Sequence, residues 1–270
     1  MINNMLDKFK EKELDDSVVH IKEAAERKGE YTEPYSIGYP IFDDALKGGV
    51  RAGNLIIITG KSGEGKTTLA QNIAVNLSKE ILPSLFFSYE VIIDDLYAKF
   101  KEMGAEDEEF FLYTPKKNTS GQLKWVKEKI KEGLEKYHTK FVFIDHIDFL
   151  TPSKVENSDQ HRIMLRNICQ EFKSMAIELE IVIFLLAHVR KILYGKEIEL
   201  QDVAESAGIY QNADFVFSIA REYAKQNIGG KKVEVVTDES IMKLLKNRIT
   251  GKQPFMKFTL DEKNIIRSLH

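Results

Sequence analysis

The chain has almost no cysteine, no long hydrophobic run and no excess of positive charge. Cys169 is the only cysteine among 270 residues, which excludes an internal disulfide framework and fits a reducing compartment. No apolar run approaches membrane-spanning length, and the first residues, MINNMLDKFKEKELDD, are too polar for a secretory signal. We therefore expect a cytoplasmic protein with no membrane partner.

The charge balance limits the kinds of partner. Lysine and arginine number 39 against 42 aspartate and glutamate residues, a formal net charge of −3. This excludes a whole-protein basic field of the kind that binds nucleic acid without specificity, so any contact with a polyanion has to be local. The 43% of hydrophobic and 30% of charged residues are typical of a globular domain with a sizeable core.

Apolar runs typical of buried strands alternate with amphipathic helices from about residue 41 onward. The runs are NLIIITG, SLFFSYE, FVFID and IVIFLLAH, at residues 54–60, 84–90, 141–145 and 181–188. Between them, apolar residues recur at helical spacing, as in the set Leu69, Ile73 and Leu77. Strands that are apolar on both faces and alternate with helices predict an α/β fold, with a mostly parallel sheet covered by helices on both sides.

From residue 214 the pattern changes to strands separated by turns. The segments DFVFSIA, KKVEVV, IMKLLKN and PFMKFTL predict an antiparallel C-terminal extension of the same sheet. Residues 241–255 in particular predict the two arms of a β-hairpin. Because side chains alternate along a strand, we expect Met242, Leu244, Lys246 and Arg248 to share one face. The two cations on it are interpreted either as solvated charge or as a pair presented to an anion.

Residues 60–67, GKSGEGKT, match the phosphate-loop pattern G-x-x-x-x-G-K-[ST] and lie between an apolar strand and an amphipathic helix. The glycines permit backbone N–H groups to converge on phosphate oxygens at the positive end of that helix. Lys66 is expected to reach the β- and γ-phosphates, and Thr67 to offer its hydroxyl to Mg²⁺. ATP and Mg²⁺ are therefore the predicted cofactors, and the predicted binding residues are Gly60, Ser62, Gly63, Glu64, Gly65, Lys66, Thr67 and Thr68.

Three other predicted strands end in polar residues, at the sheet edge where ligands bind in doubly wound folds. Asp145 ends FVFID and is expected to complete the Mg²⁺ site with Thr67, with Asp148 as a nearby competitor. Glu90 ends LFFSYE and is interpreted either as a carboxylate that polarises the water attacking the γ-phosphate or as a surface glutamate at a strand end. His188 ends IVIFLLAH and is interpreted either as a phosphate contact or as a hydrogen-bonded structural residue.

From about Tyr35 to the end, these segments resemble, in order, the C-terminal ATPase domain of DnaB-type replicative ring helicases, a branch of the RecA-like ATPases. SIGYPIFDDALKGGVRAGNLIIITGKSGEGKTTLA resembles the family's approach to its phosphate loop, LFFSYEV its FFSLEM segment, and FVFIDHIDFL its metal-binding strand. LQDVAESAGIYQNADFVFSIAREY resembles DLRESGSIEQDADVV. The resemblance implies a RecA-like ATPase domain over residues 35–270, preceded by a linker helix and connector over residues 1–34. It also implies that Glu90 is the catalytic base.

LLKNRITG, residues 244–251, resembles the family's KxRxG stretch. There the lysine and arginine reach across a subunit interface to the γ-phosphate bound by the next subunit. The resemblance carries this role over to Lys246 and Arg248, with Gly251 one residue later than the family's glycine. Such cations act on charge that develops in the transition state, as arginine fingers do.

Two features depart from the family pattern. The family usually has glutamine where this chain has His188, although phage and mitochondrial ring helicases often carry histidine there, which keeps a phosphate-sensor role open. The N-terminus holds only a short predicted helix in place of the domain that contacts primase in bacterial relatives. Its apolar stripe of Leu14, Val18 and Ile21 resembles the linker helix that docks on an adjacent subunit. The chain is expected to be either a natural minimal helicase, acting in the host cytoplasm if phage-encoded, or a fragment.

The resemblance further implies a homohexameric ring around single-stranded DNA, with primase or a helicase loader as possible further partners. The loops after the third and fourth predicted strands should line the channel. This places Lys154 in one loop and Arg190, Lys191 and Lys196 in the other. Because ring helicases of this class grip the sugar-phosphate backbone, cations and backbone N–H groups suffice. Each of these residues is interpreted either as a DNA contact or as solvated surface.

The sequence therefore predicts an ATP-dependent replicative DNA helicase motor, which the resemblance implies moves 5′ to 3′ on single-stranded DNA. Two alternatives stay open. One is a RecA- or RadA-like recombination ATPase that forms filaments. The other is a nucleotide-gated regulatory ATPase, similar to clock or signalling members of the superfamily, without helicase activity.

Overall fold

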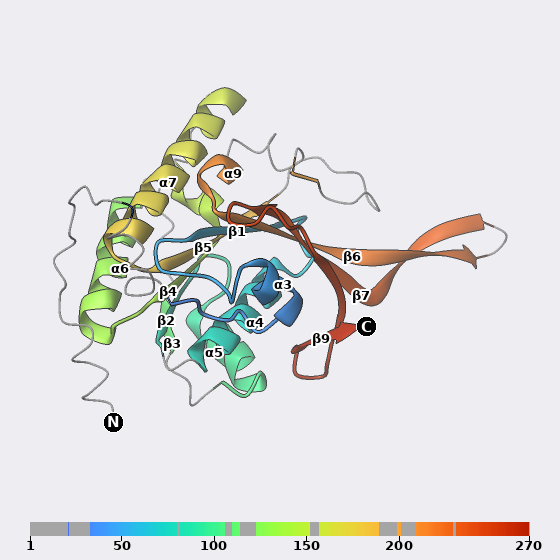
Figure 1. Cartoon of the computed structure of the whole chain (residues 1–270). Helices are drawn as coiled ribbons and strands as arrows, with labels where there is room; N and C mark the ends of the chain where they lie inside the picture. Colours follow the sequence, from blue (N-terminus) through green and yellow to red (C-terminus); the bar gives the residue numbers. More distant parts are fainter. Residues whose placement is uncertain are drawn as a thin grey trace. The chain divides into compact units, whose positions relative to one another are not determined.

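The computed structural model describes residues 21, 33–79, 82–105, 110–113, 123–151, 157–188, 199–200, 209–228 and 231–269 (Figure 1). Residues from Pro34 onward form one compact unit, separate from the residues before it. The predicted linker helix lies outside the described residues except for Ile21.

A single nine-stranded sheet organises this unit. Its strands lie in the order β3-β2-β4-β5-β1-β6-β7-β8-β9. They span β1 Leu55–Gly60, β2 Ser84–Ser88, β3 Phe110–Tyr113, β4 Phe141–Asp145, β5 Val182–His188, β6 Phe215–Ile228, β7 Lys231–Asn247, β8 Phe255–Leu260 and β9 Ile266–Leu269. Every pairing from β3 across to β6 is parallel, and β7, β8 and β9 are added antiparallel. The predicted fold class is confirmed, although β6, the first strand of the C-terminal region, still runs parallel to β1.

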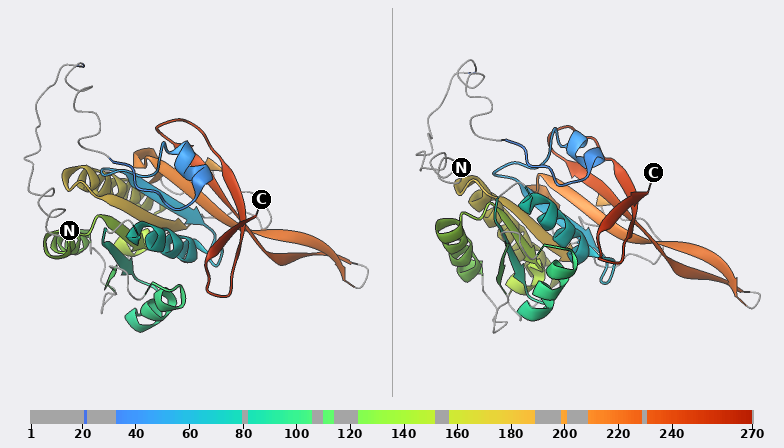
Figure 2. Two further views of the ribbon diagram at one scale, coloured as in Figure 1. Left: turned by 60° about the horizontal axis from the view of Figure 1, so that its bottom comes forward. Right: turned by 90° about the horizontal axis from the view of Figure 1, so that it is seen from below.

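Helices cover both faces of the sheet, which Figure 2 shows from two further directions. On one face lie α3 (Pro40–Ala45), α4 (Lys66–Ser78) and α5 (Ile93–Glu102). The other face carries α6 (Leu123–Tyr137), α7 (Ser158–Glu178) and α9 (Ile209–Asn212), and a 3₁₀ turn, η2 (Ile147–Leu150), follows β4. None of the helices in the described part of the chain combines the length and apolar character needed to cross a membrane.

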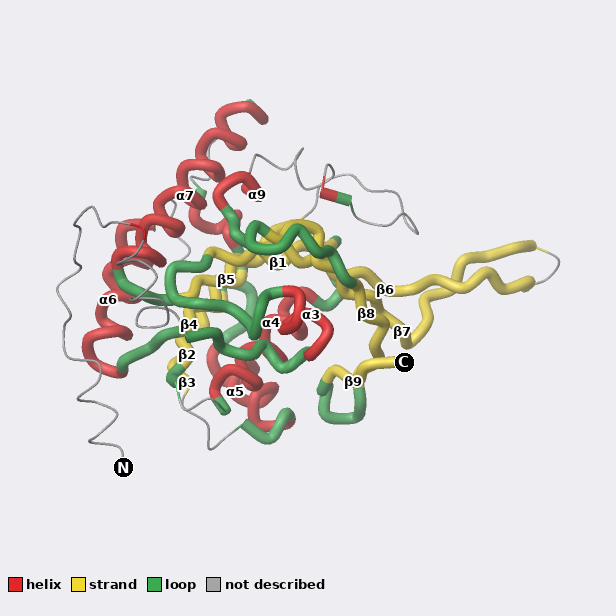
Figure 3. Tube along the Cα trace, in the orientation of Figure 1, coloured by secondary structure: helices red, strands yellow, loops and turns green. Residues whose placement is uncertain are grey.

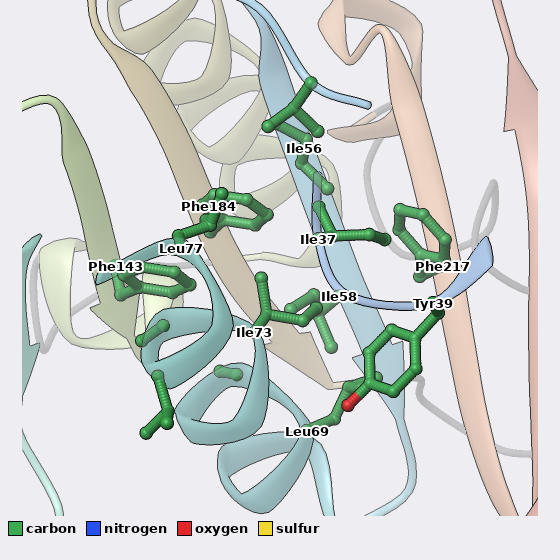
Figure 4. Close-up of a cluster of buried hydrophobic side chains, with 14 of the residues drawn as sticks. Ile37, Tyr39, Ile56, Ile58, Leu69, Ile73, Leu77, Phe143, Phe184 and Phe217 are labelled. Carbon is green, nitrogen blue, oxygen red and sulfur yellow. The ribbon is translucent and has the colours of Figure 1, made fainter. Parts of the chain in front are cut away.

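The core forms because each parallel strand is apolar on both faces. Leu69, Ile73 and Leu77 of α4 are fully buried and pack toward Ile56 and Ile58 of β1, as Figure 4 shows. The intervening strand residues, such as Ile57, belong to the core on the opposite face with α6 and α7. Burial of this kind contributes about 25 cal/mol per Å² of apolar surface, so the helices are held mainly by their apolar stripes.

The C-terminal strands are longer than the sequence pattern predicted. The two segments KKVEVV and IMKLLKN form one strand, β7, and β6 continues to Ile228, so the two make a long ribbon that projects beyond the sheet (Figure 3). The outer part of the ribbon has no core to face, and Val233 and Val236 are exposed. The alternation of apolar and polar residues in this outer part does not reflect burial on one face. The sequence pattern therefore predicted two short strands where the structure has one.

One prediction about the hairpin is wrong. The β7–β8 hairpin itself forms, but Met242, Leu244, Lys246 and Arg248 do not share a face. Leu244 pairs with Phe217, while Lys246 pairs with the adjacent Val216, so the register shifts by one residue between them. Phe217 belongs to the core on the α4 side and Val216 to the core on the α7 side. The bulge therefore turns Lys246 to the α7 side, and Arg248 lies in the turn beyond the strand.

Candidate active site

The predicted site residues at the strand ends gather at one edge of the parallel sheet. Gly60, the last residue of β1, lies beside His188, the last residue of β5, and Ser88 of β2 lies beside Asp145 of β4. Glu90 follows β2 by two residues. This is the carboxyl edge of the sheet, where doubly wound folds bind their ligands.

The loop from Gly60 to α4 has the backbone of a phosphate cradle. Gly65 precedes α4 with φ of 99°, a left-handed conformation that favours glycine. At Gly60 a side chain is excluded for a different reason, since a Cβ there would lie 2.7 Å from the carbonyl oxygen of Ile219 in β6. The loop ends at the N-terminus of a 13-residue helix, whose free N–H groups favour an anion.

The amine of Lys66 is folded back into this loop. Its Nζ donates hydrogen bonds to the carbonyl oxygens of Gly60 (3.1 Å) and Lys61 (2.8 Å) and to Nδ1 of His188 (2.9 Å). Burial lowers the pKa of Lys66, and the carboxylates of Asp145 and Glu90 oppose that change. The cation is thus held where phosphate oxygens would replace the carbonyls as its partners.

Thr67 and Asp145 meet directly. The Thr67 hydroxyl donates to Oδ2 of Asp145 at 2.7 Å, and Asp145 is only 1% exposed. A hydroxyl and a carboxylate are oxygen ligands of the kind Mg²⁺ takes, so the residues present fit the predicted metal site. Burial raises the pKa of the Asp145 carboxyl to about 6, with the Thr67 hydrogen bond acting in the opposite direction. A buried carboxylate at this position is costly until a cation joins it.

Replacing Asp145 with asparagine is expected to stabilise the nucleotide- and metal-free protein. The raised pKa means that the folded state disfavours the charged form, at a cost of roughly 1 to 3 kcal/mol at neutral pH. The cost is absent below the unfolded-state pKa near 4 and complete above about pH 6, so the gain should shrink as pH falls. Denaturant unfolding of the wild type and Asp145→Asn at pH 7 and pH 4 measures this. Asp44→Asn, at an exposed position of α3, is the control, and an equal gain there would contradict the explanation.

Sequence reasoning missed His146, which follows Asp145 and lies beside His188. The two ring centroids are 3.7 Å apart, and His146 is 2% exposed. Burial, followed by the charges of His188 and Lys66, lowers the pKa of His146 to about 3. The only signal in the sequence was its place at the end of a buried strand, which also applied to Asp145 and His188.

The other predicted residues of the phosphate loop, Ser62, Glu64 and Thr68, lie in different environments. Ser62 is exposed, and Thr68 lies in the first turn of α4. The side chain of Glu64 is turned to β6, where its carboxylate accepts hydrogen bonds from the backbone N–H of Arg221 and, at 3.3 Å, from the Tyr223 hydroxyl. Glu64 can therefore offer a nucleotide its backbone N–H but not its carboxylate, and the loop is tied to the base of the β6–β7 ribbon.

Lys246 and Arg248 lie in a separate cluster. Lys246 Nζ donates to the carbonyl oxygens of Tyr210 (2.8 Å) and Ala213 (2.7 Å) at the end of α9. Arg248 is 49% exposed, and its guanidinium pairs with Oδ1 of Asp214 at 3.1 Å. Asp214 also accepts from Lys173 Nζ and from the backbone N–H of Leu55. The anchoring of Arg248 by Asp214 is a second feature that the sequence reasoning missed.

The cluster is at the opposite edge of the sheet from the phosphate loop. The Arg248 N–H donates to the Asp214 carbonyl, and the Asp214 N–H donates to the carbonyl of Leu55, the first residue of β1. Gly60 is the last residue of that strand, five positions further on. At about 3.3 Å per residue the two sites are roughly 16 Å apart along the strand direction. An arginine side chain held by Asp214 cannot span this distance to its own phosphate loop.

The predicted DNA contacts Lys154, Arg190, Lys191 and Lys196 all lie outside the described residues, as do most residues of the two loops that carry them. Their role stays a prediction.

The part of the sequence that contains the phosphate loop matches a known protein family. The family model described as the KaiC ATPase matches residues 35–207, more than half of the chain. The chain belongs to the KaiC family of ATPases. The match covers β1 to β5 with all the residues gathered at the carboxyl edge, and it ends before β6 and the cations of β7. Family membership supports nucleotide binding at the loop.

Curated relatives of two kinds are similar to this chain. The DNA repair protein RadA of Streptococcus pneumoniae is 27% identical over 150 residues, which are 56% of this chain and 33% of that protein. The replicative DNA helicase DnaB of Helicobacter pylori is 26% identical over 211 residues, 68% of this chain and 43% of that protein. DnaB of Rickettsia conorii is 25% identical over 212 residues, 64% and 42% respectively. The chain thus spans less than half the length of these relatives.

Two solved structures share the fold. A DnaB-like replicative helicase, described with its interactions with primase, has a TM-score of 0.73 at 17% identity, covering 100% of this chain and 71% of that one. The ATPase domain of G40P has a TM-score of 0.72 at 17% identity, covering 97% and 100%. The predicted resemblance to the ATPase domain of DnaB-type helicases is confirmed at the level of the fold.

Proposed function

We propose that this chain is an ATP-dependent DNA helicase motor that hydrolyses ATP at interfaces between identical subunits. The observation that carries the proposal is the separation of the site into two parts. The phosphate loop lies at the carboxyl edge of the sheet and the cations Lys246 and Arg248 lie at the amino edge. If both act on one γ-phosphate, two copies must meet head to tail, because no single chain brings them together. Repetition of such a contact gives a closed ring or an open filament.

Each half of the site has a chemical task in this proposal. Lys66 contacts the transferred phosphate, and Thr67 with Asp145 holds Mg²⁺, which neutralises phosphate charge when bound. Glu90 positions the attacking water and accepts its proton. Nδ1 of His188 accepts a hydrogen bond from Lys66 in this structure and becomes free when Lys66 moves to the phosphate. This change in hydrogen bonding suits His188 to the role of a nucleotide sensor. Arg248 and Lys246 of the neighbouring copy stabilise the charge of the transition state.

A hexameric ring on single-stranded DNA, moving 5′ to 3′, is the finer form of the proposal. The DnaB matches support it because they extend over 211 and 212 residues and the DnaB-like fold covers the whole chain. Primase or a loader is a possible further partner, since one structural neighbour was described with primase. Lys154, Arg190, Lys191 and Lys196 remain the proposed contacts to the DNA backbone.

A recombination ATPase is the second candidate, favoured by the RadA matches at 27% identity. The same head-to-tail contact would then build filaments on DNA. Electron micrographs with an ATP analogue and single-stranded DNA distinguish the two, since closed rings support the helicase and open filaments the recombination ATPase.

ATP hydrolysis is expected to rise several-fold when single-stranded DNA is added, because a translocating motor couples its hydrolysis cycle to the strand. Steady-state ATPase rates with and without the DNA measure this, with blunt duplex DNA as the control. The same preparation should displace one strand of a forked duplex. An unchanged ATPase rate together with no strand displacement would contradict the helicase proposal and favour a nucleotide-gated regulatory ATPase.

A further inference from the structure

Three potential metal ligands converge beside the phosphate loop without belonging to the Thr67–Asp145 pair. Glu90, His146 and His188 follow or end β2, β4 and β5, which are neighbours in the sheet. Each offers one ligand atom, and these atoms all lie within 4.8 Å of one another. Ligand atoms of a tetrahedral zinc site are about 3.4 Å apart, since each lies about 2.1 Å from the metal. Glu90 is exposed, so rotation of its side chain can close the remaining gap.

His146 is the unexplained member of the cluster. It is 2% exposed, and neither ring nitrogen makes a hydrogen bond of ordinary geometry within the described part of the chain, although the Leu186 backbone lies close enough to act weakly on the imidazole. The nearest carboxylate, Oδ2 of Asp148, is 3.7 Å from Nδ1. Buried polar side chains are nearly always hydrogen-bonded, because leaving one unpaired comes at a cost to the stability of the folded protein. A ligand that uses a ring nitrogen would remove this cost.

We propose that Glu90, His146 and His188 form a binding site for a transition-metal dication of the Zn²⁺ class. Two imidazoles and one carboxylate are a donor set that suits Zn²⁺ or Co²⁺, whereas Mg²⁺ prefers oxygen ligands and its proposed site is the Thr67–Asp145 pair. Three protein ligands leave a coordination position for water or for a phosphate oxygen. The exposed carboxylate of Glu90 and the partly exposed His188 give the site an opening to solvent.

Lys66 opposes occupancy of this site. Its ammonium donates to Nδ1 of His188 at 2.9 Å, so the ring proton is on Nε2 in this arrangement. A metal on His188 has to displace either the ammonium or that proton, and in both cases a second positive charge lies close by. Removal of the Lys66 charge should therefore strengthen metal binding.

Bound metal should also stop hydrolysis, an effect that rests on the function proposed above. A metal on Glu90 occupies the carboxylate that would accept the proton of the attacking water, and a metal on His188 blocks the sensor. Micromolar Zn²⁺ in the presence of excess Mg²⁺ should then inhibit the ATPase. Metal binding by the nucleotide-free chain does not depend on this step and is tested separately.

The test is titration of the full, nucleotide-free chain with Co²⁺ alone, followed by its visible absorption and by calorimetry. We expect one equivalent to bind with bands typical of a four-coordinate site. His146→Ala and Glu90→Gln should each weaken binding at least about tenfold, and Lys66→Met should strengthen it. Glu90→Gln keeps the test decisive if His146→Ala fails to fold, because Glu90 is exposed.

His138→Asn, at an exposed position directly after α6, is the matched control and should bind Co²⁺ as the wild type does. The proposal is overturned if the wild type shows no such bands, or if Glu90→Gln and Lys66→Met bind like the control. Co²⁺ binding without Zn²⁺ inhibition of an active ATPase would uphold the metal site and contradict the role given to Glu90. A chain with no ATPase activity would contradict the proposed function while leaving the titration valid.

Discussion

Replacing Arg248 with alanine is expected to abolish ATP turnover while leaving ATP binding nearly intact. The phosphate loop, Lys66 and the Thr67–Asp145 pair are all at the other edge of the sheet and keep their contacts. The substitution removes stabilisation of the transition state, and an arginine supplied by a neighbouring subunit raises the rate of hydrolysis about 10³-fold or more. Steady-state ATPase rates and the affinity for a fluorescent ATP analogue measure the two effects.

Two further variants distinguish the catalytic role of Arg248 in trans from a general effect of positive surface charge. Arg267→Ala removes another surface arginine, one that pairs with Asp261, and should leave the ATPase rate unchanged. Arg248→Lys keeps the charge beside Asp214 but loses the planar fork that grips two oxygens, so it should remain strongly impaired. Stability should hardly change in Arg248→Ala, since a half-exposed ion pair contributes at most about 1 kcal/mol. Normal ATPase activity in Arg248→Ala would contradict a catalytic role of this arginine at the neighbouring subunit's site.

Replacing Glu90 with glutamine is expected to lower the hydrolysis rate by roughly 10²- to 10⁴-fold, the contribution usual for a general base. The amide keeps the size and the hydrogen-bonding reach of the side chain but cannot accept the proton. ATP binding should persist, because Lys66 and the loop backbone hold the phosphates. Single-turnover hydrolysis in the presence of saturating single-stranded DNA isolates the chemical step from product release.

Glu102→Gln, at the exposed end of α5, is the matched control for this variant and should hydrolyse ATP at the wild-type rate. If Glu90→Gln hydrolyses ATP as fast as this control, another group positions the water. Asp148 is then the next candidate, because it lies half-buried in η2 beside His146.

The sequence was sufficient to predict the parallel sheet and its carboxyl edge. Apolar runs such as residues 54–60 and 141–145 encode burial on both faces, and the position of Asp145 or His188 at the end of a run places it at the edge. The glycine spacing of the phosphate loop encodes a backbone conformation directly, as φ of 99° at Gly65 illustrates. In these cases the residues that form the sequence pattern also determine the local structure, so the pattern predicts that structure.

The remaining features depend on contacts between distant segments. The bulge that turns Lys246 away from Leu244 arises from pairing with β6, and nothing within residues 241–248 signals it. Asp214 joins α7, β1 and the Arg248 turn, and its partner Leu55 in β1 is 159 positions away from it in the sequence. His146 was overlooked because a histidine after a strand has no distinctive pattern, and only the fold brings it to His188.

The most direct measurement is a mixing experiment with two inactive variants. Lys66→Ala lacks the phosphate contact but keeps Lys246 and Arg248, whereas Arg248→Ala keeps the phosphate loop but lacks the arginine. If the active site is shared between copies, a mixture of the two should recover ATPase activity that neither has alone, because some interfaces then combine an intact loop with an intact Arg248. A mixture no more active than the separate variants, under conditions where the subunits are shown to co-assemble, would contradict the shared site.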